Sequence, residues 1–241
     1  MKKHLLVTGG AGFIGSNFVH LAVAHGYQVT ILDALTYAGH EANIRDCIAS
    51  GKCQLIRGRI EDAEFVNSLF AQNKFSSIVH FAAESHVDNS ITGPEAFVQT
   101  NVLGTFVLLQ AARAMFTKLS DSERVGFRFV HVSTDEVFGS LGENGYFTED
   151  TAYAPNSPYS ASKAASDHLA RAWFHTYSLP TIITNCSNNY GPRQFPEKLI
   201  PRMITLALRG EKLPVYGKGM NVRDWIHVED HCAGVLLALE N

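Results

Sequence analysis

Residues 4–15 of this chain have the sequence HLLVTGGAGFIG. Its apolar start predicts a buried strand over residues 4–8, and its glycines predict a tight turn into a helix over residues 12–25. Such a turn brings backbone N–H groups and a helix N-terminus close to a pyrophosphate. The spacing is G-x-x-G-x-x-G, formed by Gly9, Gly12 and Gly15. It favours a dinucleotide-binding domain, although glycine-rich turns also occur only to pack a helix.

Short apolar runs alternate with helical patterns along the rest of the chain. The apolar runs predict strands over residues 28–33, 53–57, 77–82, 128–133 and 181–186. The helical patterns cover residues 61–73, 94–117, 158–177 and 197–209, and a further helix starts near Glu229. This alternation is typical of βαβ units joined by right-handed crossovers. We therefore expect an α/β fold with a Rossmann-like, doubly wound parallel sheet.

Asp33 stands at the end of the second expected strand, about twenty residues after the glycine loop. A carboxylate there accepts hydrogen bonds from a ribose diol and repels a 2′-phosphate, which favours NAD over NADP. An alternative role for Asp33 is to cap a helix in the segment after Ala34. Residues 58–62 and 81–85, which follow two other strands, are expected at the same site.

The alternation breaks after about residue 187, where prolines and glycines separate short elements. We therefore expect two parts. Residues 1–187 form an NAD-binding Rossmann domain that carries the catalytic residues, and residues 188–241 begin a lobe that covers the substrate. We expect this second part to be incomplete, because few residues remain after it begins.

The composition is that of an ordinary globular protein, with 46% apolar residues, 18% charged residues and a net charge of −3. This charge gives no electrostatic footprint for nucleic acid or an anionic membrane. No apolar stretch approaches the length of a membrane span. The four cysteines and eleven histidines show no metal-ligand spacing, so we predict no metal. We interpret the cysteines as reduced thiols of a cytoplasmic protein.

Two clusters carry the expected chemistry: STDE at residues 133–136 ends a strand, and YSASK at residues 159–163 opens a helix. Positions i and i+4 share one helix face, so Tyr159 and Lys163 can point at the same place. A free tyrosine has a pKa of about 10, and an ammonium group or a positive nicotinamide ring would favour its phenolate. Tyr159 could then accept a proton from an alcohol whose oxygen Thr134 hydrogen-bonds.

Asp135 and Glu136 suggest a further step. An alcohol dehydrogenase or a sugar epimerase needs only the tyrosine, the lysine and a hydroxyl. Two neighbouring carboxyl groups, one protonated and one ionised, can add a proton at one atom and remove one at the next. Elimination of water requires this pair, although the carboxylates could also cap the strand end or lie solvated in a loop.

Several motifs together resemble the dTDP-glucose 4,6-dehydratase family of the extended short-chain dehydrogenase/reductase superfamily. The likeness runs from the first strand to the last residue, and the T-D-E triplet separates this family from its epimerase relatives. The motifs are TGGAGFIG at 8–15, AAESHVD at 82–88, STDEV at 133–137, YSASK at 159–163, NCSNNYGP at 185–192 and RDW at 223–225.

The resemblance implies a redox-neutral lyase that retains its NAD. In this family's reaction, Tyr159 would deprotonate the glucose 4-hydroxyl as hydride passes from C4 to NAD⁺. Glu136 would remove the C5 proton, and Asp135 would protonate the departing 6-hydroxyl. The hydride would return to C6, giving dTDP-4-keto-6-deoxyglucose. Thr134 and Lys163 complete the implied catalytic set.

The resemblance also implies which residues contact the two ligands. The cofactor residues would be Gly9, Gly12, Phe13, Ile14, Gly15, Asp33, Leu35, Thr36, Arg59, Ile60, Phe81, Ala82, Ala83, Ser85, Thr100, Tyr159, Lys163 and Asn189. The dTDP-glucose residues would be Ser85, Thr134, Asn188, Lys198, Leu199, Tyr216 and Arg223. A surface ion pair remains an alternative for Arg223, and a turn remains one for Asn188 and Asn189.

Three features depart from the family pattern. Arg59 replaces a usual acidic residue after the third strand, and Phe138 replaces a usual tyrosine. Family members also continue past the last residue here, so we expect a truncated chain.

The resemblance implies a homodimer through helices 94–117 and 158–177. Burial of the same apolar helix faces under the missing lobe is the alternative. Two other functions stay open: a UDP- or CDP-sugar epimerase or dehydratase, and a non-catalytic NAD-binding module.

Overall fold

A computed structural model describes residues 3–142, 145–215 and 217–241. Its centre is a six-stranded parallel sheet in the order β3-β2-β1-β4-β5-β6. The strands are β1 (His4–Thr8), β2 (Gln28–Asp33), β3 (Cys53–Arg57), β4 (Ser77–His80), β5 (Phe129–Thr134) and β6 (Thr181–Cys186). This order confirms the expected doubly wound, Rossmann-like sheet.

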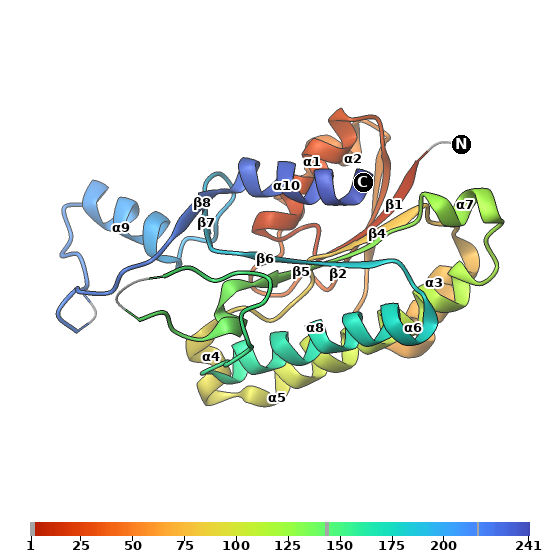
Figure 1. Ribbon diagram of the computed structural model, residues 1–241. Coiled ribbons are helices and arrows are strands. Elements are labelled where there is room, and N and C mark those ends of the chain that lie inside the picture. The colour runs from red at the N-terminus through yellow and green to blue at the C-terminus, as the bar shows by residue number, and fades with distance from the viewer. Residues whose placement is uncertain (1–2, 143–144, 216) are drawn as a thin grey trace.

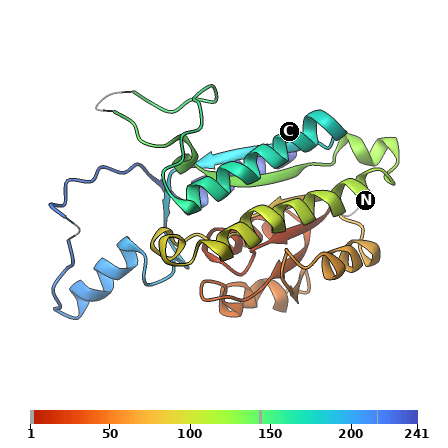
Figure 2. The same ribbon diagram turned by 90° about the horizontal axis from the view of Figure 1, so that it is seen from below.

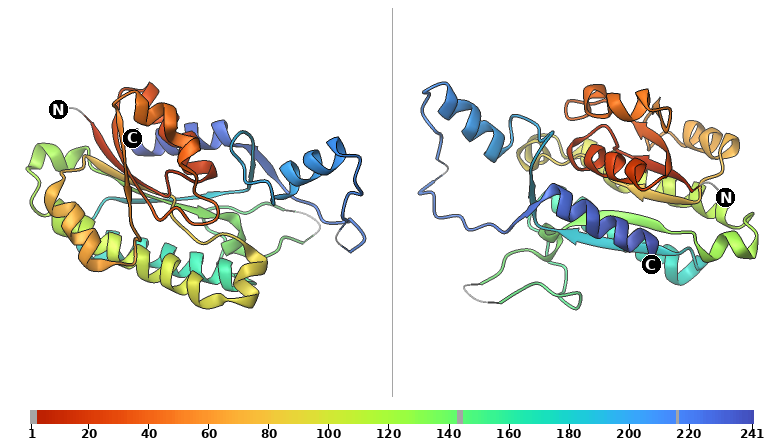
Figure 3. Two further views of the ribbon diagram at one scale, coloured as in Figure 1. Left: turned by 180° about the vertical axis from the view of Figure 1, so that it is seen from behind. Right: turned by 90° about the horizontal axis from the view of Figure 1, so that it is seen from above.

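Helices cover both faces of the sheet, as Figures 1 and 3 show. One face carries α1 (Phe13–Ala24), α2 (Arg45–Ala49) and α10 (Val228–Glu240). The other carries α3 (Ala63–Gln72), α6 (Thr105–Phe116) and α8 (Pro158–Tyr177). Figure 2 shows α6 and α8 running side by side across this second face.

The central strand β1 serves two hydrophobic cores, because its side chains alternate between the faces of the sheet. In β1, Leu5 and Val7 belong to the core beneath α1 and α10. Leu6, between them, belongs to the core beneath α3, α6 and α8. All three side chains are buried, which is why the strand reads as a continuous apolar run.

The helix expected over residues 94–117 has three parts: α5 (Pro94–Phe97), a π-helical segment, η2 (Val98–Gly104), and α6. The wider turn is fixed by Asn101, whose side-chain amide donates to the Glu84 carbonyl (3.0 Å) and to Ser162 Oγ (2.9 Å). Gly104 lies where a Cβ would meet Ile60 at 2.6 Å. Tertiary contacts therefore set this break, as is common for π-bulges.

Several short elements lie outside the predicted pattern. They are η1 (Glu41–Ile44), α2, α4 (Val87–Thr92), α7 (Asp121–Val125) and η3 (Asp135–Phe138). Two short strands, β7 (Asn188–Tyr190) and β8 (Trp225–His227), form a separate parallel pair. The strand expected over residues 77–82 ends at His80, so Phe81 and Ala82 begin a loop.

Between β7 and β8 the chain extends away from the sheet and forms α9 (Leu199–Leu208) (Figure 1). After β8 the chain returns to the sheet, and α10 packs against α1. The segment after residue 187 therefore contributes both an extension and part of the main core. A division between residues 187 and 188 stays a prediction. Within the described residues, no helix has the length and apolarity to cross a bilayer.

Candidate active site

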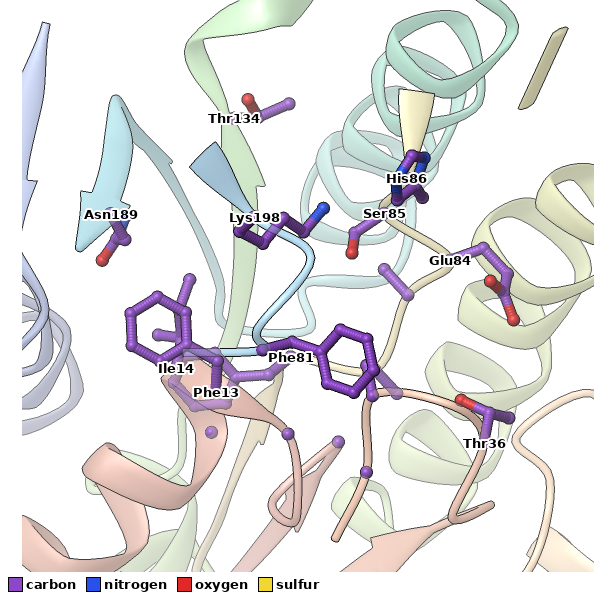
Figure 4. A pocket seen from close by; sticks show the side chains of 18 of the residues that line it. Phe13, Ile14, Thr36, Phe81, Glu84, Ser85, His86, Thr134, Asn189 and Lys198 are labelled. Atoms are coloured by element: carbon purple, nitrogen blue, oxygen red, sulfur yellow. The ribbon is translucent and has the colours of Figure 1, made fainter. Parts of the chain in front are cut away.

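A cavity of about 630 Å³ opens where the carboxyl ends of the parallel strands meet. Its walls come from the glycine loop, the segments after β2, β3 and β4, the end of β5, the start of α8 and the loop before α9. Figure 4 shows Phe13, Ile14, Phe81, Thr134 and Lys198 around it. Ligands of open α/β sheets bind at this edge.

The glycine loop lies directly against the chain that leaves β4. Gly9 has φ +69°, and a Cβ there would lie 2.6 Å from the backbone nitrogen of Ala82. Gly12 precedes the first turn of α1, and its N–H donates to the Gly9 carbonyl at 3.1 Å. The absence of side chains at these positions leaves the N-terminus of α1 open to the cavity, where it can face a pyrophosphate.

The Asp33 carboxylate is buried at the end of β2 and binds the loops on both sides. It accepts hydrogen bonds from the N–H groups of Ala11 (2.9 Å) and Leu35 (2.8 Å). Burial raises its pKa, and these two hydrogen bonds oppose the rise. Asp33 also lines the cavity. The carboxylate therefore fixes the loop geometry and still faces a ligand.

The structure brings nearly all of the expected cofactor residues to this cavity. Leu35 is the exception: it contacts Asp33 through its backbone and does not line the cavity. Arg59 lies at the rim, with Nη1 2.9 Å from Glu61 Oε1. The lining set is Gly9, Gly12, Phe13, Ile14, Gly15, Asp33, Thr36, Arg59, Ile60, Phe81, Ala82, Ala83, Ser85, Thr100, Tyr159, Lys163 and Asn189.

Tyr159 and Lys163 enter the cavity from the first two turns of α8. The helix starts in a capping box between Ser157 and Ser160, with Pro158 at its first position, a combination that fixes a helix N-terminus. The Lys163 ammonium is buried and donates to the Val132 carbonyl at 2.9 Å.

The pKa of Tyr159 is raised, first by burial and then by the negative charge of Glu136. The Thr134 hydroxyl opposes this rise through a hydrogen bond. The Lys163 ammonium donates to the Val132 carbonyl, and its expected support of the phenolate stays a prediction. The raised pKa favours the neutral phenol of Tyr159 in this structure.

Thr134, Asp135 and Glu136 follow each other where β5 turns into η3. Thr134 is held by Asn185 of β6, whose side-chain amide donates to its carbonyl at 3.0 Å. Burial raises the pKa of both Asp135 and Glu136, and the charge of Asp135 raises that of Glu136 further. Glu136 lines the cavity with Thr134, whereas Asp135 accepts from the Thr134 hydroxyl (3.3 Å) and does not line it.

The residues expected to contact a sugar nucleotide divide into three groups. Ser85, Thr134, Asn188, Lys198 and Leu199 line the cavity. Arg223 is exposed and does not line it, and its Nη1 donates to the Val222 carbonyl at 2.8 Å. The positive charges of Arg223 and Lys198 nevertheless lower the pKa of Glu136 against its burial. Tyr216 lies outside the described residues.

One group of lining residues could not be found from sequence patterns. Phe195 packs on His40 in a stacked arrangement (5.7 Å between ring centroids) and edge-on against Tyr37 (5.8 Å). Glu197 Oε1 lies 3.5 Å from His86 Nε2. These contacts join segments more than a hundred residues apart across the cavity mouth, and no local motif signals such pairs.

The described residues contain no group of three or more His, Cys, Asp or Glu side chains placed to hold a metal ion. Together, the fold and the cavity define a nucleotide-binding enzyme of the short-chain dehydrogenase/reductase superfamily. A glycine loop, the Asp33 carboxylate and the pair of Tyr159 and Lys163 all line one cavity.

Comparison with known proteins narrows this class. Residues 6–241 match the family described as GDP-mannose 4,6 dehydratase. A dTDP-glucose 4,6-dehydratase of Xanthomonas campestris is 58% identical over 97% of this chain and 67% of its own length. The dTDP-glucose 4,6-dehydratase 1 of Escherichia coli is 54% identical over 94% and 66%, respectively.

Comparison with solved structures points to the same family as the sequence relatives. A dTDP-glucose 4,6-dehydratase of Streptomyces venezuelae, with NAD bound, has a TM-score of 0.90 at 49% identity over 99% of this chain and 72% of that one. A UDP-glucose 4-epimerase of Thermotoga maritima has a TM-score of 0.88 at 29% identity over 98% and 73%. The chain belongs to the dTDP-glucose 4,6-dehydratase family, which confirms the resemblance. It spans about two thirds of the length of the curated relatives that it matches.

We predict that Asp33→Asn weakens NAD binding at least about tenfold, because a charge-assisted hydrogen bond contributes about 1.5–3 kcal/mol. Isothermal titration of cofactor-free protein measures the affinity. The affinity for NADP should fall less than the affinity for NAD, because the variant no longer repels a 2′-phosphate. Asp46→Asn, at an exposed position in α2, is the control. Equal NAD affinity in both variants would remove Asp33 from the cofactor site.

Proposed function

We propose that this protein dehydrates dTDP-glucose to dTDP-4-keto-6-deoxyglucose with a retained NAD. One observation carries the proposal: Thr134, Glu136, Tyr159 and Lys163 line the same cavity as the glycine loop. The relatives named dTDP-glucose 4,6-dehydratase, several of them solved with NAD, support the substrate and the cofactor.

The residues around the cavity fit NAD. Gly12 opens the N-terminus of α1 toward a pyrophosphate, and Asp33 offers a carboxylate to a ribose diol. When bound, NAD would supply a hydride acceptor for C4 of the sugar and a hydride store for C6. Phe13, Ile14 and Phe81 are apolar lining residues that exclude water from this space.

Proton transfers are the work of the protein side chains. Tyr159 takes the proton of the 4-hydroxyl, and Thr134 holds the same oxygen by a hydrogen bond. Because burial raises the pKa of Tyr159, the phenolate needs positive charge nearby. Lys163 and the positive nicotinamide ring of the bound cofactor provide that charge.

The two acids act after oxidation at C4. A ketone at C4 acidifies the C5 proton, which Glu136 removes, while Asp135 protonates the departing 6-hydroxyl. Burial raises the pKa of both groups, which favours the protonated form that a general acid needs. Lys198, Ser85 and Asn188 line the cavity beside Glu136 and are the sugar-nucleotide contacts that we propose.

We predict that Tyr159→Phe abolishes NAD reduction by dTDP-glucose, because no base remains for the 4-hydroxyl. Glu136→Gln should still permit C4 oxidation but stop exchange of the C5 proton with solvent. Absorbance follows the first reaction, and NMR in deuterated water follows the second. Glu149→Gln, at an exposed loop position, should retain both. Loss of hydride transfer alone in both variants would contradict this division of roles, and a galactose product would indicate an epimerase.

We also propose a homodimer formed through η2, α6 and α8. This face exposes large apolar side chains: Val98 is 54% exposed, Leu103 41%, Phe106 37% and Phe174 49%. Phe106 meets Trp173 of α8 at 5.8 Å between ring centroids, so the two helices present one continuous apolar surface. Such exposed apolar patches mark protein–protein contact sites.

We also propose that the protein works in the reducing cytoplasm, because its four cysteines are free thiols.

Phe106→Glu is expected to convert a dimer to a monomer, because a buried charge without a partner weakens an apolar interface. Sedimentation velocity measures the change. Leu208→Glu alters a more exposed leucine of α9, 84% accessible, and should leave the dimer intact. A wild-type monomer at micromolar concentration, or equal effects of both changes, would refute the interface.

A further inference from the structure

A buried carboxylate lies one helical turn beyond Lys163. Asp167 is 1% exposed and follows Tyr159 and Lys163 on the same face of α8, at intervals of four residues. It does not line the cavity and has no part in the sequence motifs discussed above. Charged side chains are almost never this buried without a partner, so its position calls for a reason.

The carboxylate is held from three sides. The hydroxyls of Ser133 (2.8 Å) and Tyr153 (3.0 Å) both donate to Asp167 Oδ2. On the other oxygen, His131 Nε2 lies 3.1 Å from Oδ1. Ser133 immediately precedes Thr134, so the same carboxylate anchors the end of β5 that carries the catalytic threonine.

Lys163 depends on this group electrostatically. Its ammonium is 4% exposed and binds an uncharged carbonyl, that of Val132. Burial lowers the pKa of Lys163, and the charge of Asp167 acts against this. Burial would raise the pKa of Asp167, but His131, Lys163 and Ser133 bring it below its usual value. The two buried charges therefore stabilise each other.

We propose that Asp167 is a positioning residue of this active site: it keeps the Lys163 ammonium charged and fixes the end of β5 beside Thr134. The consequence for catalysis rests on the proposed function, because Lys163 assists Tyr159 only in the charged form. Asp167 itself contacts neither the cavity nor a reacting atom.

The other titratable groups near this pair do not replace it. His131 and His80, from β5 and β4, have pKa values lowered by burial and stay neutral. Burial raises the pKa of the Cys186 thiol of β6 to about 11. The phenols of Tyr153 and Tyr159 also have raised pKa values, again through burial first. The charges of Asp135 and Glu136 raise the pKa of Tyr159, whereas the charges that act on the pKa of Lys163 are those of Asp167 and Cys186.

We predict that Asp167→Asn lowers the pKa of Lys163 by about one unit, a tenfold weaker binding of its proton, as loss of a nearby opposite charge requires. The measurement is an NMR titration of protein with ¹³C-labelled lysine, in which Lys163→Arg identifies the signal. It needs no substrate, so it tests Asp167 even if the dehydration is not observed. Where turnover is observed, the alkaline limb of its pH profile should shift to lower pH, because Lys163 loses its proton sooner.

Ser166→Ala is the matched control, because it removes a buried hydrogen bond to His131 (3.0 Å) and to the Lys163 carbonyl (2.8 Å) without removing charge. The Lys163 titration should not move in this variant. Asp167→Ser removes the same charge with a smaller side chain, so it should lower the Lys163 pKa in the same direction, and it serves if Asp167→Asn does not fold. An unchanged Lys163 titration in Asp167→Asn, or equal shifts in Ser166→Ala, would overturn the proposal.

Discussion

The close approach of Gly9 to the backbone of Ala82 sets the geometry of the cavity. It holds the carboxyl ends of β1 and β4 together with no side chain between them. The start of α1 then faces the loop after β4, and the cavity lies between them. Any Cβ at Gly9 would have to displace backbone atoms, which are far less able to move than a side chain.

A second feature of the site is its buried charged side chains. Asp33, Lys163 and Asp167 are each at most 8% exposed. Removing such groups from water costs several kcal/mol for each ion unless hydrogen bonds or opposite charges compensate. Asp33 is compensated by backbone N–H groups, and Asp167 by two hydroxyls and an imidazole. The fold thus holds these charges in fixed positions before a ligand arrives, a condition for electrostatic catalysis.

Much of the fold could be predicted because its signals are local. The strands at residues 28–33, 53–57 and 181–186 match β2, β3 and β6 residue for residue, since each is a short apolar run bounded by turn residues. The break in the helix after Pro94 could not be found in this way. It depends on hydrogen bonds from Asn101 to two other segments.

The site follows the same division. Residues in compact motifs, such as the glycine loop and the pair of Tyr159 and Lys163, lie together at the cavity as expected. Phe195, which bridges Tyr37 and His40, was missed because aromatic contacts between distant loops leave no pattern in the sequence. Leu35, Asp135 and Arg223, all expected at the site, do not line the cavity of this structure.

We propose that one cavity carries out oxidation, elimination and reduction on the same sugar without releasing its cofactor. Supplying dTDP-glucose with deuterium at C4, and locating the label by mass spectrometry and NMR, tests this most directly. We expect deuterium at C6 of a 4-keto-6-deoxy product, with no added NADH. Deuterium found in free cofactor or in solvent, or retained at C4 of a sugar that has lost no water, would contradict it.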